Sequence, residues 1–158
     1  MAIEREDGDP DMYAVRATAC ARLQRHDEAR EDWRRFTRNL TVDFERQVRN
    51  WAHLSLDVND LDGATVLSTA LLERKPYDFD AFSIRGRARL VGEQVDDAIN
   101  DLSRAIRLGH DDSAAALAAV YDARGKAYEM KGRTDDARAD LDEAKRLLAE
   151  DLDRRSKN

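Results

Sequence analysis

The sequence predicts an all-α protein built from four antiparallel pairs of helices. Four segments align on one another, and in each an alanine follows a small residue by twelve positions; the pairs are Ala17/Ala29, Ala52/Ala64, Gly86/Ala98 and Gly125/Ala137. A fixed period of about one helix pair is typical of stacked units that bury a core only against their neighbours. Glycine (7) and proline (2) are scarce and 38% of the residues are charged, which favours long helices with solvated outer faces.

The first pair of helices has clear start signals. Asp9 followed by Pro10 predicts an N-cap and the first residue of a helix that reaches about Arg25. Asp27 should cap the second helix. The apolar stripe of this second helix follows steps of four, three and four residues and consists of Ala29, Trp33, Phe36 and Leu40.

The second and third pairs follow the same scheme. The second pair should begin near Asp43, turn at residues 59–62 and end at Pro76, because the residue before a proline disfavours the helical conformation. Asp78 should begin the third pair. Gly92 and Gly109 are placed as C-terminal stops for its two helices.

Five extra residues enter before the fourth pair. Ala52 and Gly86 are 34 residues apart, whereas Gly86 and Gly125 are 39 apart. We place the insertion in residues 113–117, where Ser113 should cap an Ala-rich extension of the next helix. The first helix of the fourth pair should therefore be the longest of the four first helices.

Length and composition predict one soluble domain. A chain of 158 residues can enclose one sizeable core, so we expect a single domain over 10–155, with repeats at about 10–43, 45–78, 79–112 and 118–151 and a frayed segment at 1–9. The net charge of -6 and the lack of a basic lobe make nucleic acid an unfavourable partner. No apolar run is long enough to span a bilayer or follows a basic start, which predicts no membrane insertion and a cytoplasmic location.

The repeated slots resemble those of the tetratricopeptide repeat family, over roughly residues 10–151. The match is strongest in the last two repeats, at Phe82, Gly86, Ala98, Leu102 and Ala105 and at Tyr121, Gly125, Tyr128, Ala137, Leu141 and Ala144. Ser55 and Arg89 depart from the family's tyrosine slot. The resemblance implies a right-handed superhelix whose concave groove, lined by the first helix of each pair, receives a peptide or a partner helix.

A second departure from the family pattern predicts ion pairs within repeats. The family's leucine slot on the first helix holds arginine in three repeats, and the facing slot on the second helix holds aspartate in the same three; the pairs are Arg16/Asp32, Arg85/Asp101 and Arg124/Asp140. In the second repeat both positions become apolar, as Trp51 and Leu67. This joint change favours contact over the alternative that these are separate solvated charges.

The sequence offers no catalytic, metal or cofactor site. Its three histidines are scattered, and neither a metal-binding HExxH pattern nor a Gly-rich phosphate loop occurs. The single cysteine, Cys20, excludes an internal disulfide and falls in an inward helical slot, so we expect it to be a small buried core residue. We therefore expect no enzyme and no cofactor.

The lining slots of the implied groove give the candidate partner-binding residues. Three of them occupy one slot in successive repeats, His53, Arg87 and Lys126, and should form a basic row. An equally acceptable interpretation is a mixed-charge face on which three bases happen to align. The full set of candidates is Arg46, Arg49, Asn50, His53, Ile84, Arg87, Leu90, Lys126 and Met130.

These observations favour a non-catalytic adaptor, assembly chaperone or regulatory subunit that binds a protein or peptide presenting acidic groups. One alternative is a structural homo-oligomer, in its simplest form a homodimer, in which Leu147 and Leu152 are left for another copy to cover. A less favoured alternative is an RNA-binding helical repeat that uses the basic row.

Overall fold

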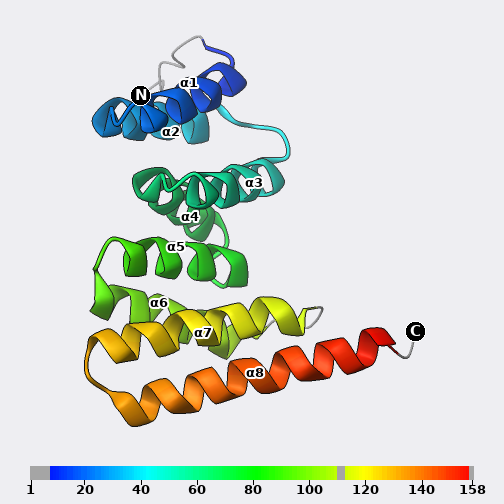
Figure 1. Cartoon of the computed structure of the whole chain (residues 1–158). Coiled ribbons are helices and arrows are strands. Elements are labelled where there is room, and N and C mark those ends of the chain that lie inside the picture. Colours follow the sequence, from blue (N-terminus) through cyan, green and yellow to red (C-terminus); the bar gives the residue numbers. More distant parts are fainter. Residues whose placement is uncertain (1–7, 110–112, 157–158) are drawn as a thin grey trace. The chain divides into compact units, whose positions relative to one another are not determined.

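The computed structural model describes residues 8–109 and 113–156, and this part of the chain is helical, without strands (Figure 1). Consecutive helices pack as four antiparallel pairs, which confirms the predicted fold class. The helices are α1 Pro10–Arg22, α2 His26–Asn39, α3 Phe44–Asp57, α4 Leu61–Arg74, α5 Phe79–Val91, α6 Val95–Leu108, α7 Ala114–Met130 and α8 Thr134–Ser156.

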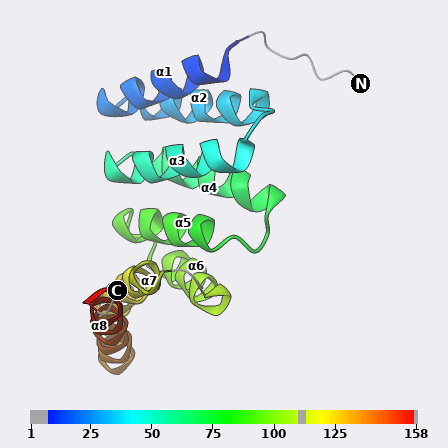
Figure 2. The ribbon, with the colours of Figure 1, turned by 90° about the vertical axis from the view of Figure 1, so that its right-hand side faces the viewer.

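The chain divides into two compact units, which are described separately. The N-terminal unit, Met1–Pro76, contains the α1/α2 and α3/α4 pairs, and α2 packs against α4. The C-terminal unit, Tyr77–Asn158, contains the α5/α6 and α7/α8 pairs, and both α5 and α6 pack against α7. Within each pair the two helices lie side by side and a short turn joins them (Figure 2).

The turn inside each pair has the same geometry in all four repeats. The residue seven positions after the small-residue slot adopts a left-handed conformation, with φ of 57° at Gln24, 60° at Asn59, 60° at Glu93 and 71° at Gly132. The next residue donates its backbone N–H to the carbonyl five residues earlier, as Gln94 does to Arg89 at 2.8 Å. This is the Schellman arrangement, which satisfies the last carbonyls of the first helix.

The predicted helix stops and three predicted N-caps are confirmed, and one predicted N-cap is wrong. Gly92 and Gly109 are the C-caps of α5 and α6, which confirms them as helix stops; in the turn after α5 the left-handed residue is Glu93, since Gly92 has φ of -79°. Asp27 is not an N-cap, because the turn starts α2 at His26 and places Asp27 in the first helical turn. The predicted caps Asp9, Asp78 and Ser113 are confirmed, since each side chain accepts a backbone N–H of the helix that it starts.

Small residues let the two helices of a pair approach closely. A Cβ atom on Gly86 would lie 2.8 Å from Cγ of Leu102, and one on Gly125 would lie 3.0 Å from Cγ of Leu141. Distances this short would force the neighbouring leucine or the helices to move. The glycines thus set the spacing between α5 and α6 and between α7 and α8.

The close approach brings together the three predicted Arg–Asp pairs, each through two hydrogen bonds. Nε of Arg85 and Nε of Arg124 lie 2.8 and 2.7 Å from Oδ2 of Asp101 and Asp140. Arg16 bonds Asp32 in the same way, and this hydrogen bond raises the pKa of the Arg16 guanidinium. The three aspartates are buried, and the contact that the sequence predicted is confirmed in all three repeats.

An aromatic cluster joins the two pairs of the N-terminal unit. Trp33 and Phe36 of α2 and Trp51 of α3 have ring centroids 5.6 to 6.4 Å apart. Nε1 of Trp33 donates to Oδ2 of Asp60, the N-cap of α4, at 2.8 Å. Gly63 leaves room for this bond, because a Cβ atom there would lie 2.4 Å from Nε1.

The N-terminal extension of α7 is confirmed. α7 has 17 residues against 13 or 14 in α1, α3 and α5. Leu117 in the extension packs on a buried cluster that includes Ala144 and Leu147 of α8. Leu147 is therefore only 8% exposed, and the expectation that it is left for another copy of the chain to cover is wrong. Leu152 is 68% exposed.

We predict different coupling energies for the exposed and the enclosed ion pair. Alanine double-mutant cycles should give about 1 to 3 kcal/mol for Arg124/Asp140, where the arginine side chain is 17% exposed. They should give below about 1 kcal/mol for Arg16/Asp32, where it is 58% exposed. Urea unfolding measures both, and equal couplings would show that enclosure of the guanidinium does not matter.

We predict opposite effects of glycine at two equivalent turns. Glu93→Gly should stabilise the fold by about 0.5 kcal/mol, because glycine adopts the left-handed conformation without a steric penalty. Gly132→Ala should destabilise it by about 1 kcal/mol for the same reason. Thermal unfolding of the two variants tests the shared geometry, and a stabilising Gly132→Ala would contradict it.

We predict that Trp33 anchors the N-terminal unit. Trp33→Ala should cost about 3 to 5 kcal/mol, because Trp33 is 1% exposed and its ring fills the contact with α3 and α4. Trp33→Phe keeps an aromatic ring but removes the donor to Asp60, and should cost about 1 to 3 kcal/mol. A loss below about 1 kcal/mol for Trp33→Ala would show that the cluster is not an anchor.

Candidate functional site

In the C-terminal unit the structure brings two of the predicted basic residues onto neighbouring first helices. Arg87 lies on α5 and Lys126 on α7, both one residue after the small-residue slot, and α5 packs against α7. The Lys126 side chain is 60% exposed, and its Nζ lies 2.7 Å from Oδ2 of Asp122 on the same helix. Arg87 is half-buried and makes no ion pair with another described residue.

Apolar candidates around this pair divide into accessible and buried residues. Met130, in the last turn of α7, is 55% exposed, and Leu90 on α5 is half-buried. Ile84 is 0% exposed, which corrects its assignment as a lining residue. Its register is the reason, because two residues before the small slot a first helix of this unit faces inward, as Ala123 of α7 also does.

In the N-terminal unit the candidates lie along α3. Asn50 and His53 are exposed, and Arg49 is half-buried. Arg46 is exposed and forms an ion pair with Asp43; the hydrogen bond between them lowers the pKa of the Asp43 carboxyl. His53 belongs to this unit and Arg87 and Lys126 to the other, so the row of three bases stays a prediction.

Arg74 was missed by the sequence analysis. Its guanidinium carbon lies 3.4 Å from the centroid of the Phe44 ring, and together with Arg46 and Arg49 it lines a shallow pocket of about 340 Å³. Arg74 lies in the last turn of α4, where a basic side chain suits the helix dipole, so its position carried no signal of a pocket.

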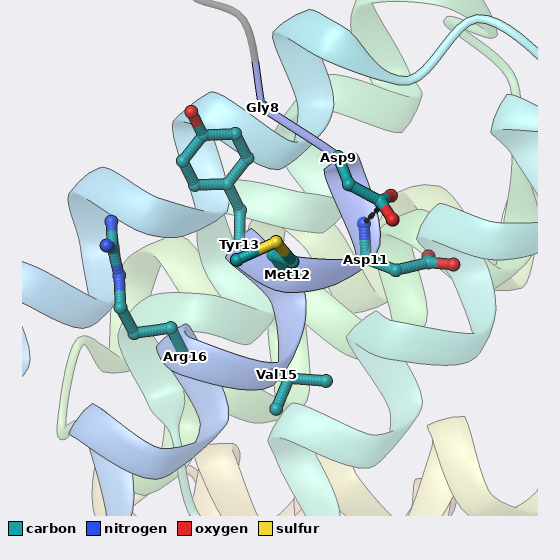
Figure 3. Close-up of a pocket in the computed structure, with 7 residues that line it drawn as sticks. All are labelled: Gly8, Asp9, Asp11, Met12, Tyr13, Val15 and Arg16. Atoms are coloured by element: carbon teal, nitrogen blue, oxygen red, sulfur yellow. Dashed lines mark hydrogen bonds between the residues drawn. The ribbon is translucent and has the colours of Figure 1, made fainter.

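A second cavity, also missed, lies on α1 (Figure 3). It has a volume of about 550 Å³. Two of its lining residues are large exposed apolar side chains, Met12 at 70% and Val15 at 62% exposure. The lining residues are Gly8, Asp9, Asp11, Met12, Tyr13, Val15 and Arg16.

The described part of the chain has neither a metal-binding cluster nor a membrane-spanning helix. Within 8–109 and 113–156 no three His, Cys, Asp or Glu side chains gather closely enough to hold a metal ion. No helix in this part of the chain combines the length and the apolar character needed to cross a bilayer. Cys20 is buried, as its inward slot predicted.

The helix pairs, their shared turns and their small-residue slots define a tetratricopeptide-like helical repeat, and similar solved structures support this fold class. MamA matches with a TM-score of 0.64 at 15% identity, over 94% of this chain and 83% of that chain. A mutant of MamA matches with a TM-score of 0.61 at 22% identity, over 89% and 98%. BtubC from P. vanneervenii matches with a TM-score of 0.61 at 20% identity, over 92% and 67%.

No family model and no curated protein matches this chain. The likeness to the solved structures lies below 25% identity and therefore establishes the fold, not the partner.

Proposed function

We propose that this chain is a non-catalytic protein-interaction module of the cytoplasm, forming one domain over residues 10–155, that binds an acidic peptide or partner helix. The observation that carries the proposal is the placement of Arg87 and Lys126 at one register on the packed helices α5 and α7. A rigid pair of helices holds these two charges toward one ligand without the entropy cost of ordering a loop. Met130 offers apolar contact beside them.

The surroundings of the two bases set the ligand chemistry. Lys126 already neighbours Asp122, so an acidic ligand would share Lys126 with this carboxylate, and Arg87 would supply the more available charge. The guanidinium of Arg87 favours a bidentate carboxylate. In the same proposal Arg46, Arg49, Asn50 and His53 form a candidate binding face on α3 of the N-terminal unit.

Reversal of the two charges tests the proposal. An array of 12-residue peptides, matched in length and graded from acidic to basic, serves as the probe. Wild-type protein should retain acidic peptides, and Arg87→Glu/Lys126→Glu should lower their affinity about tenfold or more, because attraction becomes repulsion. The retained affinity of the variant should also depend less on salt than that of the wild type.

The control reverses two exposed bases on second helices, Arg107→Glu of α6 and Lys145→Glu of α8, with the same change in net charge. This control should keep the wild-type affinity apart from a small long-range effect. An equal loss of peptide affinity in both double variants would show that only the net charge matters, and it would contradict a localised site. Tighter, steeply salt-dependent binding to single-stranded RNA that needs Arg87 and Lys126 would favour the RNA-binding alternative.

A further inference from the structure

The outward face of α1 carries an apolar stripe that no other described element covers. Met12, Val15, Ala19 and Leu23 recur at steps of three, four and four residues, which places them along one side of the helix. All four are exposed, with Met12 at 70%, Val15 at 62% and Leu23 at 67%. The opposite side of α1, with Ala14, Ala17 and Cys20, is buried, and α2 is the helix packed closely against α1.

The repeat register identifies this stripe as a helix-docking face. Relative to the small-residue slots, Met12, Val15 and Ala19 correspond to Val120, Ala123 and Ala127 of α7. In α7 these three residues are 0%, 7% and 0% exposed. They lie on the side away from Gly125, which faces α8, and the other helices packed against α7 are α5 and α6. In α1 the same positions are exposed, and none of the described helices packs against them.

The equivalent surface at the other terminal repeat does not complement the stripe. On α6, Ser103 accepts a hydrogen bond from Nη1 of Arg124, so it faces α7, and Ile99 and Ile106 flank it on the same side. The corresponding residues of α8 are Arg138, Asp142 and Lys145, all exposed. Docking of α1 on α8 of another copy would bury these charges against Met12 and Val15, which is costly.

The stripe does complement itself when two copies of α1 run antiparallel. A centre near residue 17 places Val15 opposite Ala19 of a second copy, a larger side chain against a smaller one, and Met12 opposite Leu23. On one flank the same pairing places Asp11 near Arg22 of the second copy. Both residues are exposed, and neither forms an ion pair with another described residue. The two-fold axis makes each of these contacts twice.

The cavity on α1 fits this arrangement. It lies at the N-terminal end of the stripe, between Gly8 and Arg16, which is where an antiparallel α1 brings Leu23 and Arg22 of the second copy. Leu23 would enter the apolar side formed by Met12 and Val15. Asp9 and Asp11, which also line the cavity, would meet Arg22.

We propose that the occupant of this stripe is a second copy of the chain, which forms a two-fold homodimer through antiparallel α1 helices. The contact between single helices is smaller than a standard stable interface, so the dimer dissociates on dilution. This surface shares no residue with the Arg87/Lys126 face. An experiment that disproves the dimer therefore leaves the proposed function untouched, and the reverse also holds.

Sedimentation equilibrium of the 158-residue chain, from about 10 μM to about 1 mM, covers the range in which small interfaces associate. The wild type should shift from monomer to dimer across this range. Val15→Asp should stay monomeric throughout, because it buries a carboxylate against Ala19 on each side of the two-fold axis. Val42→Asp is the matched control, since Val42 is an equally exposed valine (73%) in the turn between α2 and α3, and it should dimerise like the wild type. Circular dichroism checks that all variants fold.

Charge exchange tests the antiparallel pairing itself. Asp11→Arg or Arg22→Asp alone should weaken dimerisation about fivefold or more, because each change creates two like-charge contacts. The double variant Asp11→Arg/Arg22→Asp should restore the wild-type dissociation constant. A monomeric wild type at 1 mM, a dimer that survives Val15→Asp, a dimer lost with Leu152→Asp, or a double variant without rescue would each overturn the proposal.

Discussion

The close crossing of the two helices in each pair is the constraint on which the rest of the structure depends. In the C-terminal unit Gly86 and Gly125 let a leucine of the second helix reach the backbone of the first. The arginine immediately before each glycine and the aspartate immediately before each leucine are thereby brought into two-point contact. A wider crossing would leave a buried carboxylate without its partner, so each of these ion pairs depends on the small residue beside it.

The same crossing accounts for what could be predicted from the sequence. The fold could be predicted from the period of the small residues. The ion pairs could be predicted because Arg and Asp change together to Trp51 and Leu67 in the second repeat, and residues that touch within a repeat vary together. The left-handed residue of the turn was not predicted, since a position held by Gln24, Asn59, Glu93 and Gly132 has no common composition. Ile84 and Leu147 were misassigned because their burial depends on neighbouring repeats and on the α7 extension, which a single repeat does not reveal.

The candidate surfaces were harder to predict than the core for a physical reason. Core slots must satisfy packing in every repeat, so the repeats agree, whereas a surface slot is free to differ from one repeat to the next. Arg87 and Lys126 could be found because they recur at one register. The contact of Arg74 with Phe44 occurs in one repeat only. The exposed stripe of α1 consists of ordinary apolar residues, and it is recognised as a docking face only because the equivalent residues of α7 are buried.

The two proposed surfaces differ in chemistry and therefore in what they contribute. An apolar helix pairing gains from burial and responds little to salt, whereas a basic face recognises acidic groups through a screened attraction. A homodimer formed through α1 carries two copies of the Arg87/Lys126 face. A partner with two acidic segments, or a dimeric partner, would then be held by two contacts, each of modest strength, at an effective concentration set by the segment between them. Reversible pairing through a small apolar stripe would in this way make partner capture depend on the concentration of the chain itself.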